Sequence, residues 1–378
     1  MMHEASLPLD CPPPPAATAP HPGAISVLQL QQHDHARWDG FVMACPQASF
    51  FHRAGWQTIM EQGFGHDSYF LYAEQDGRIA GVLPLAHLRS RLFGSSLVAL
   101  PFCVYGGIAG GGAPVRQALD GAAQSLARRL DVGHLEYRWR EQPQDDGGHA
   151  GSGENGENAP WLHKPLYATF RRALHADAEQ NLLAIPRKQR AVVRKGMANG
   201  LHSAIDYDLS SFYPVYAASV HRLGTPVFAR RHFALLRTVF GSDCDILTVY
   251  QGQQAQASVM TFYFRDEVLP YYGGGSVLAR STGANDFMYW EVMRRAGARG
   301  YRLFDFGRSK LGTGAYDFKK NWGFAPQALP YAYRLVRASK LPEVNPTNPK
   351  FALSIRAWRR LPLPLANLLG PHIVRHLG

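Results

Sequence analysis

A cluster of polar side chains follows an apolar run, Tyr301 to Phe306, that has the pattern of a buried strand. Asp305 interrupts this run, and Arg308 follows shortly after it. Burying a carboxylate is costly unless it is paired, so Arg308 is the expected partner. Ligands of open α/β sheets gather beyond the carboxyl ends of strands. The cluster is therefore either a reaction site or a structural Asp–Arg pair that fixes the strand end.

A second candidate for chemistry is Lys319, which lies between Phe318 and Trp322. An ammonium group held among aromatic side chains can stabilise a developing oxyanion. The alternative is a surface lysine pair, Lys319 with Lys320, beside a cluster of core aromatic residues.

A turn that precedes an expected helix offers a binding site for a cofactor phosphate. The turn runs from Arg280 through Gly283 to Asn285. Free N–H groups at a helix N-terminus bind pyrophosphate, so these three residues are candidate cofactor-binding residues. A plain capped helix is the alternative.

A basic helix is expected from Pro186 onward. It carries Arg187, Arg190 and Arg194 on one face. Such a face either contacts the phosphates of a substrate or is only solvated.

The overall charge favours an anionic partner. The formal net charge is +11, from 40 Lys and Arg against 29 Asp and Glu. A nucleotide, a phosphate-bearing substrate, tRNA or an anionic membrane would each suit it, and solubility alone is the alternative.

Several common catalytic signatures are absent from the sequence. The four cysteines and sixteen histidines show no metal-ligand spacing. There is also no nucleophile elbow, Walker loop or zinc-protease motif. The hydrolase, ATPase and metalloenzyme classes are therefore disfavoured, and neither a metal nor a permanently bound cofactor is expected.

The elements expected to position these residues repeat in two halves of the chain. In the first half, the strands and helix are expected at 69–73, 79–88, 97–104, 115–130 (helix) and 134–139. In the second half they are expected at 246–250, 256–264, 268–272, 286–298 (helix) and 301–306. Tyr105 and Tyr272 each precede Gly-Gly, and they are separated by nearly the same length of chain as Glu136 and Asp305. This order indicates an internal duplication, and two unrelated α/β stretches are the alternative.

Composition divides the chain into four parts. These are a disordered, proline-rich lead (1–24), a first domain (25–165) with a flexible insert (142–160), a second domain (166–340) and a basic amphipathic tail (341–378). No apolar run reaches the roughly 18 residues that cross a bilayer, and the first residues lack a signal-peptide pattern. A cytoplasmic protein is expected.

The tail combines Trp358 with leucines and arginines. Prolines at 362, 364 and 371 are expected to divide it into short helices. Arginine beside tryptophan and leucine suits an anionic membrane surface, so residues 351–378 are a candidate peripheral contact at the inner face of the membrane. The alternative is that these leucines cover the core of the second domain.

The sequence from about 48 to 333 resembles the Fem-type peptidyltransferases and the wider acetyltransferase (GNAT-like) fold family. In the second half, the resemblance is carried by Tyr-Tyr-Gly-Gly from 271, Asp-Phe-Gly from 305, Phe318-Lys319 and Trp322-Gly323. The first half, with Phe50-Phe51-His52, Trp56 and Tyr105-Gly-Gly, is most similar to the Fem-like proteins associated with the PEP-CTERM/exosortase exopolysaccharide system.

The resemblance implies a mixed α/β (α+β) fold with two tandem acetyltransferase-like domains, each a mixed sheet flanked by helices, and a cleft near their junction. It further implies an acyl- or aminoacyl-transferase of cell-envelope or exopolysaccharide synthesis. The donor would be acyl-CoA or aminoacyl-tRNA, used as a co-substrate, and the acceptor an envelope or polysaccharide precursor. Asn285 occupies a position where the acetyl-CoA turn usually has a small residue, which leaves the donor open.

The resemblance also implies roles for individual residues. Lys319, at the family's reaction centre, would stabilise the oxyanion or the leaving group. Asp305 would orient the amine or accept its proton, and Arg308 would hold a phosphate. The residues implied to line the acceptor cleft are Trp56, Tyr105 and Tyr272. The alternative function is a non-catalytic module that binds a sugar-phosphate or a membrane-associated partner.

Overall fold

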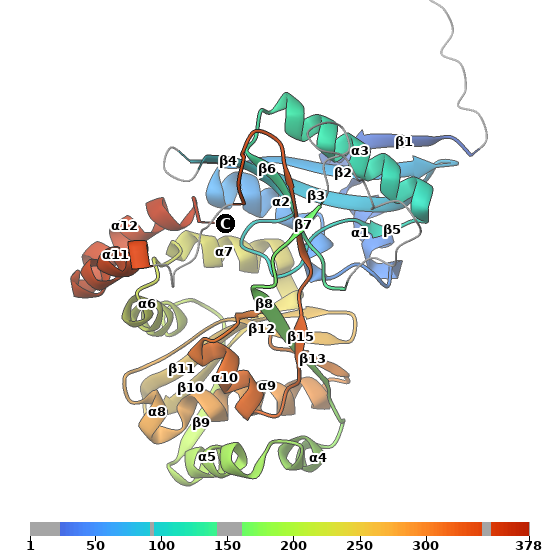
Figure 1. Ribbon diagram of the computed structural model, residues 1–378. Helices are drawn as coiled ribbons and strands as arrows, with labels where there is room; N and C mark the ends of the chain where they lie inside the picture. The colour runs from blue at the N-terminus through green and yellow to red at the C-terminus, as the bar shows by residue number, and fades with distance from the viewer. Residues whose placement is uncertain (1–22, 91–93, 142–160, 342–348, 378) are drawn as a thin grey trace, which may run out of the picture.

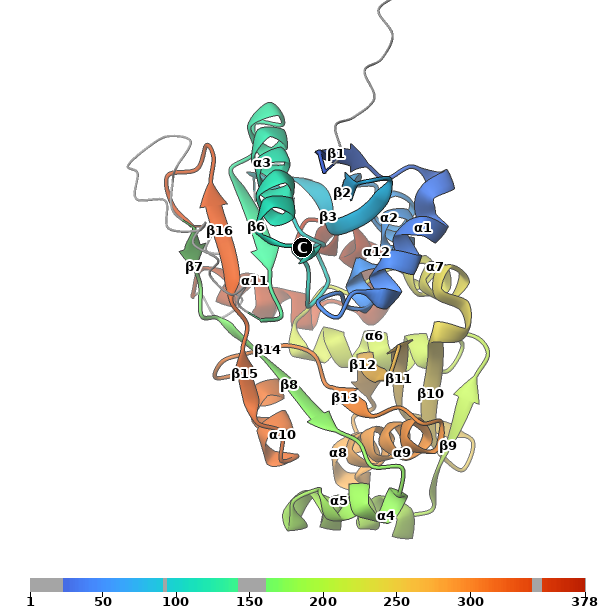
Figure 2. The ribbon, with the colours of Figure 1, turned by 90° about the vertical axis from the view of Figure 1, so that its right-hand side faces the viewer.

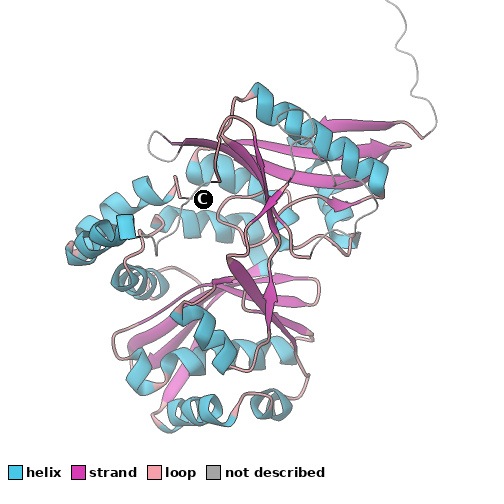
Figure 3. Cartoon of the chain, viewed as in Figure 1, coloured by secondary structure: helices cyan, strands magenta, loops and turns pink. Residues whose placement is uncertain are grey.

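Two mixed β-sheets flanked by helices form the protein (Figures 1 and 3). The structure, a computed structural model, describes residues 23–90, 94–141, 161–341 and 349–377. The expected insert at 142–160, and all but the last two residues of the expected lead, lie outside the described residues. The mixed α/β class expected from the sequence is confirmed.

The first sheet has the strand order β1-β2-β3-β4-β6-β16-β7, with β5 paired to β3. Its strands are β1 (Ile25–Gln29), β2 (Asp67–Gln75), β3 (Arg78–Ser90), β4 (Gly94–Val98), β5 (Ala109–Gly110), β6 (His134–Arg138), β7 (Leu162–His163) and β16 (Tyr331–Leu335). Asp76 and Gly77 both have positive φ, as the expected tight hairpin between β2 and β3 requires.

The second sheet has the order β14-β8-β13-β12-β11-β10-β9, with β15 paired to β8. Its strands are β8 (Tyr167–Ala173), β9 (Leu201–Asp206), β10 (Cys244–Gln251), β11 (Gln254–Phe264), β12 (Glu267–Gly275), β13 (Leu303–Asp305), β14 (Ser309–Lys310) and β15 (Pro326–Ala328).

Both sheets contain the same unit: antiparallel strands, then a helix, then a strand parallel to one that precedes the helix. In the first sheet α3 (Ala113–Arg129) follows the short strand β5 and leads to β6, which is parallel to β4. In the second sheet α9 (Ala284–Ala298) joins β12 to the parallel strand β13. The expected repeat of strands and helices is therefore present, and we call the two units the first and second module.

One expected strand is shorter than the sequence indicated. The prediction for 97–104 was wrong beyond Val98, where β4 ends. The chain leaves the sheet there and rejoins β3 at β5. Leu100 and Phe102, in the intervening loop, have positive φ, which a strand does not allow. The corresponding strand of the second module, β12, continues without this interruption.

The two sheets exchange strands. β8 follows the first module in the sequence, but it pairs with β13 of the second sheet. β16 follows the second module, but it pairs with β6 of the first sheet. The chain thus crosses between the sheets twice, and the crossing segments lie side by side at the junction (Figure 2). The expected division at residue 165 falls between β7 of the first sheet and β8 of the second.

Helices cover the sheets and the junction. They are α1 (His35–Ala44), α2 (Gly55–Thr58), the π-helix η3 (Ile59–Phe64), α4 (Ala178–Leu183), α5 (Arg187–Ala198), α6 (Phe212–Leu223), α7 (Arg230–Phe240), α8 (Ala279–Thr282), α10 (Gly314–Asn321), α11 (Pro349–Arg360) and α12 (Leu363–Val374), with the 3₁₀ turns η1 (Gln32–Asp34), η2 (Phe50–His52) and η4 (Gly241–Asp243). A side chain at Gly273 would meet Tyr289 of α9, and one at Gly274 would meet α6, so these glycines let helices approach both faces of β12.

One hydrophobic core extends through both modules. Phe50 of the first module stacks on Phe262 of the second, with ring centroids 4.5 Å apart, and Phe240 packs on both rings. Because burial of this shared apolar surface stabilises both sheets at once, the two modules are held together as one unit.

The tail forms α11 and α12, which pack against α6. Pro362 precedes α12, but Pro371 lies inside it, so the expected break at this third proline was wrong. Among the described residues, no helix has both the length and the apolar character needed to cross a membrane.

Candidate functional site

Asp305, at the end of β13, is the centre of a buried polar network between the modules. Its Oδ2 accepts a hydrogen bond of 2.8 Å from the hydroxyl of Tyr105 in the first module. Its Oδ1 accepts a hydrogen bond of 2.7 Å from the backbone N–H of Gly307. The hydroxyl of Thr169 on β8 lies 2.5 Å from that of Tyr105 and 3.4 Å from Oδ1. The carboxylate is thus fully buried but well partnered, as burial of a charge requires.

The cation that pairs with Asp305 is Arg171 of β8, not the expected Arg308. Arg171 Nε lies 3.2 Å from Asp305 Oδ2, and the same guanidinium contacts Glu267 at the start of β12. Glu267 also lies 3.5 Å from Arg140, which follows β6. Burial raises the pKa of Glu267, although the guanidinium of Arg171 opposes this shift. A chain of alternating charges thus links the first module to Asp305.

Arg308 makes a different contact. Its guanidinium donates a hydrogen bond of 3.0 Å to the Tyr331 hydroxyl and lies 4.7 Å from the ring centroid of Tyr167. Tyr331 in turn donates to the carbonyl of Val104 in the first module. Arg308 is therefore held between aromatic rings of the exchanged strands β8 and β16, where it lies half-buried.

Lys319 of α10 binds the turn that follows Asp305. Its ammonium donates to the carbonyls of Phe306, Gly307 and Arg308 at 2.7, 3.0 and 3.0 Å. Three carbonyls use all three N–H groups of a protonated lysine. Burial lowers the pKa of Lys319 to about 7, with the carboxylate of Asp305 opposing this shift. Asp305 and Lys319 therefore hold the same turn, one through its N–H group and the other through its carbonyls.

The loop between β4 and β5 meets this turn from the first module. It contains Leu100 and Phe102, which hold positive φ at a cost of roughly 1–3 kcal/mol each. Side chains hold the loop: Arg138 donates to the carbonyls of Leu100 and Cys103, and Tyr271 of β12 donates to that of Phe102. Strained backbone maintained by its surroundings is a feature of functional sites.

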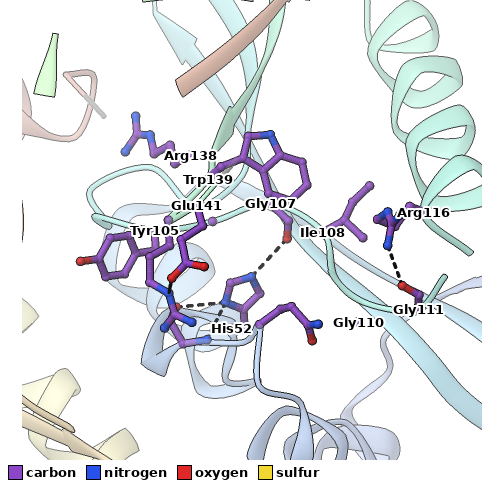
Figure 4. Close-up of a pocket in the computed structure, with 14 residues that line it drawn as sticks. His52, Tyr105, Gly107, Ile108, Gly110, Gly111, Arg116, Arg138, Trp139 and Glu141 are labelled. Carbon is purple, nitrogen blue, oxygen red and sulfur yellow. Dashed lines mark hydrogen bonds and ion pairs between the residues drawn. The ribbon is translucent and has the colours of Figure 1, made fainter. Parts of the chain in front are cut away.

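A cavity of about 390 Å³ adjoins the network on the first-module side (Figure 4). Its lining comes from the loop before β5, the start of α3, the end of β6 and the segment around η2: Gln47, Ser49, His52, Tyr105, Gly106, Gly107, Ile108, Gly110, Gly111, Arg116, Arg138, Trp139, Arg140 and Glu141. Three arginines and one glutamate make this lining net basic, which suits an anionic group. Tyr105 lies at its edge with the hydroxyl directed away from His52, toward the Asp305 network.

His52 fixes the wall of the cavity. Its Nδ1 accepts a hydrogen bond of 3.1 Å from the Ser49 N–H, which leaves Nε2 to donate to the Gly107 carbonyl at 3.2 Å (Figure 4). Burial lowers the pKa of His52 to about 4, so the ring is neutral near pH 7. A neutral imidazole in this tautomer acts as a clamp between η2 and the glycine-rich loop.

Two of the residues expected in the acceptor cleft are core residues. Trp56 is fully buried against Phe50 and Phe240, and its indole N–H donates to the Phe50 carbonyl. Tyr272 is buried against Tyr216 and neighbouring aromatic rings. Neither side chain lines the cavity.

The expected phosphate-binding residues lie elsewhere in the second module. Arg187 and Arg194 are exposed on α5, and Arg190 is half-buried there. Figures 1 and 2 both show α5 at the end of the molecule opposite α3.

The expected cofactor turn lies beside α5. Arg280 is exposed, Asn285 is half-buried, and Gly283 is buried in the left-handed conformation at the start of α9. A Cβ atom at Gly283 would come within 2.8 Å of the Val192 carbonyl, so this glycine is required for close packing of α5 on α9. The structure therefore brings together Asp305, Arg308, Lys319 and Tyr105. The arginines of α5 and the turn at 280–285 lie outside this group.

Sequence reasoning missed several members of the site. Thr169, Arg171 and Glu267 belong to the network, and Arg116 and Arg140 to the cavity. Arg171 and Glu267 are far apart in the sequence, and nothing in either segment indicates that they form a pair. In the part of the chain that the structure describes, no three His, Cys, Asp or Glu side chains are grouped to hold a metal ion.

Comparisons with known proteins agree with this architecture. Residues 187–320 match the family model described as an acetyltransferase (GNAT) domain. No curated protein matches the sequence. The crystal structure of FemX is similar over 87% of this chain and 100% of its own, with a TM-score of 0.63 and 13% identity.

Two further solved structures share the arrangement. A tandem GNAT protein from the clavulanic acid biosynthesis pathway is similar over 82% of this chain and 98% of its own, with a TM-score of 0.52 and 12% identity. L-PGS from Bacillus licheniformis is similar over 86% of this chain and 97% of its own, with a TM-score of 0.51 and 13% identity. At these identities the likeness concerns the fold alone, and it agrees with the expected tandem arrangement of two acetyltransferase-like domains.

Proposed function

We propose that this protein is an acyl- or aminoacyl-transferase that moves its group directly from an activated donor to an amine or hydroxyl of a cell-envelope or exopolysaccharide precursor. The observation that carries the proposal is the buried carboxylate of Asp305, hydrogen-bonded to Tyr105 at the edge of a basic cavity, in a fold whose second module matches the GNAT family. A buried carboxylate joined to a hydroxyl is suited to orient an amine or to accept its proton.

In this proposal the cavity of the first module holds the phosphate-bearing part of a substrate. Arg116 and Arg140 line it together with the backbone of Gly110 and Gly111. Guanidinium groups bind phosphate oxygens through paired N–H donors. The donor is either an acyl-CoA or an aminoacyl-tRNA, both of which are anionic.

Lys319 acts in this proposal through the turn that it binds. Its three N–H groups already bond carbonyls, so the ammonium positions the turn after Asp305 and adds positive charge beside the reacting groups. That charge favours a developing oxyanion. Transfer is direct, without a covalent enzyme intermediate.

The biological setting follows from the same proposal. A cytoplasmic enzyme of the PEP-CTERM/exosortase exopolysaccharide system would meet lipid-linked precursors at the inner face of the membrane. Attachment through residues 351–378 would bring it to such precursors.

Mass spectrometry of reaction mixtures tests the function. The purified protein is incubated with acyl-CoA or charged tRNA, together with amine- and hydroxyl-bearing sugar precursors, and products are identified by their added mass. We expect one donor class to give product, and Asp305→Asn to abolish it. Donor binding should weaken in Arg116→Ala but not in Arg128→Ala, which alters the other end of α3. If no donor class gives product, transferase function is rejected.

A second function, non-catalytic binding, is favoured by one observation. Every N–H group of Lys319 and both oxygens of Asp305 already have protein partners. The network would then serve only to hold the modules together around a binding cavity. Stoichiometric binding of a sugar-phosphate without turnover, unaffected by Asp305→Asn, would support this function.

A further inference from the structure

A second cavity lies away from the junction, between η3, α7 and α12. Its volume is about 300 Å³. One part of its lining is apolar: Phe64, Phe228, Leu368, Pro371 and Val374. The remainder is polar or basic and contains no acidic side chain: Arg231, His232, Asn367, His372 and Arg375, with backbone from Gly63 and Ala229. The cavity thus combines an apolar wall with a basic one.

Three buried polar atoms of this lining lack a hydrogen-bond partner among the described residues. They are His232 Nδ1, Asn367 Oδ1 and Arg375 Nε. Buried polar atoms in proteins are nearly always satisfied, so three such atoms mark this wall as an unusually polar part of the interior. They have almost no accessible surface, so a ligand in the cavity would contact other polar groups of the lining.

The outer face of α12, next to this cavity, is apolar and exposed. The inner face packs on the protein: Ala366, Gly370 and Val374 are buried, and a Cβ at Gly370 would come within 2.8 Å of the Val227 nitrogen. The outer face carries Leu365, Leu368, Leu369 and Ile373, which are 41%, 65%, 40% and 38% exposed. Residues at this spacing form one stripe along a helix. A stripe of exposed leucines of this kind marks an interaction surface.

The charged residues of α7, α11 and α12 are all basic. From Pro349 onward the sequence has no Asp or Glu. Arg356, Arg359 and Arg360 are exposed on α11, and Arg231 is exposed at the start of α7. Arg359 donates a hydrogen bond to the carbonyl of Leu223 at the end of α6, so this exposed leucine lies beside α11. Cations around leucines complement a surface with anionic headgroups and an acyl interior.

We propose that this face, comprising the outer side of α12 and the cavity beside it, binds an anionic phospholipid membrane. The phosphodiester of a lipid headgroup enters the cavity beside Arg231 and Arg375. Leu365, Leu368, Leu369 and Ile373 insert at the acyl edge of the bilayer. This site deepens the envelope setting of the proposed function, but lipid binding requires no transfer reaction and is measured independently of it.

Co-sedimentation of the full chain with vesicles tests the proposal. Vesicles of phosphatidylcholine alone are compared with vesicles that also contain phosphatidylglycerol. We expect binding only when phosphatidylglycerol is present, and we expect added salt to weaken it. Arg231→Ala combined with Arg375→Ala should lower the partition coefficient about tenfold or more. Removing Arg187 and Arg194 of α5 changes the charge equally and is expected to have little effect.

A second pair of variants tests the leucines. Leu368→Asp should reduce vesicle binding strongly, whereas Leu183→Asp, on the exposed surface of α4, should not. Circular dichroism confirms that each variant folds. Equal sedimentation of both variants with the anionic vesicles would overturn the proposal. So would a dimer, detected by sedimentation velocity, that Leu368→Asp dissociates while vesicles fail to bind the native chain.

Inorganic phosphate is used as a competitor, because the arginines that would bind a lipid headgroup would also bind a free phosphate ion. A lipid site predicts that millimolar phosphate leaves vesicle binding unchanged beyond its ionic-strength effect. Displacement by phosphate at matched ionic strength would assign the cavity to a free phosphate ligand and overturn lipid binding.

Discussion

The hydroxyl of Tyr105 donates a 2.8 Å hydrogen bond to the carboxylate of Asp305, and this bond joins the two modules through their most deeply buried charge. Both residues were candidate site residues on the basis of the sequence, Tyr105 in the first half of the chain and Asp305 in the second. Their contact connects the basic cavity of the first module with the turn of the second that Lys319 binds.

Tyr105→Phe is expected to weaken both stability and activity. The change removes one donor to Asp305 and the partner of Thr169 while preserving the ring. Loss of a hydrogen bond to a charged group should lower the free energy of unfolding by about 1–3 kcal/mol. Thermal and denaturant unfolding measure the stability, and product formation measures the activity. Tyr207→Phe, at a side chain that is 88% exposed, should change neither.

Asp305→Asn should have the larger effect. This change removes the ion pair between Arg171 and Asp305, so that Arg171 keeps its ion pair with Glu267. It also removes the negative charge to which Tyr105 and the Gly307 N–H donate. Breaking a buried ion pair costs about 3–5 kcal/mol. The double variant with Tyr105→Phe should be less destabilised than the sum of the single variants, because the residues are in contact. Additive effects would show that the two side chains act independently.

Lys319→Met is expected to disorganise the turn after Asp305. Three carbonyls lose their donors, and we expect a loss of roughly 2–4 kcal/mol together with activity. Lys320→Met changes the adjacent, exposed lysine and should leave both properties nearly unchanged. Unfolding curves and turnover of the two variants give the comparison. Full turnover in Lys319→Met would remove this residue from the site.

The same lysine predicts an alkaline limit to activity. Burial lowers the pKa of Lys319 to about 7, so the ammonium that binds three carbonyls is lost as the pH rises through this value. Activity should therefore fall as the pH rises from about 6 to about 8, with a midpoint near 7. A profile of kcat against pH measures this limit. Lys319→Arg keeps its charge at these pH values, and if the variant is active its profile should lack the alkaline fall.

Acid should destabilise the fold through its buried histidines. Burial lowers the pKa of His52 and of His66 to about 4, and that of His232 to about 3, from an ordinary value near 6.5. Below pH 6.5 the unfolded chain binds protons that the folded chain does not bind, so stability present above this pH is lost as the pH falls toward 4. Each histidine contributes up to about 3 kcal/mol to this loss.

Urea unfolding at several pH values between 4 and 7 measures this dependence. His232→Phe should make the dependence shallower because it removes one of the three histidines. His33→Gln, at an exposed side chain, should leave the slope unchanged. A slope unaffected by His232→Phe would contradict the assignment.

Much of the strand and helix order could be predicted from the sequence, because periodicity reports which residues are buried. The parallel pairing of β12 with β13 follows from the helix between them. The pairing of β8 with β13 does not, since alternation along a strand carries no information about its partner. Leu100 and Phe102 also look like strand residues, and only their surroundings force them into positive φ.

The candidate site, too, was only partly predictable from the sequence. Asp305, Arg308 and Lys319 lie near one another in the sequence and converge in space, so a local cluster was visible. Arg171, which pairs with Asp305, comes from the exchanged strand and had no local signal. Trp56 belonged to a recognisable motif, yet it is a core residue because its motif specifies the shared core.

The exchange of β8 and β16 also constrains how the chain acquires its fold during synthesis. When the first module leaves the ribosome, β6 lacks its neighbour, because β16 is translated only after the whole second module. The edge of β6 therefore stays open for most of elongation, and such edges pair readily with other chains. We expect the first module produced alone to aggregate through this edge. For the same reason, cutting the chain at residue 165 should yield halves that fold only when they are expressed together.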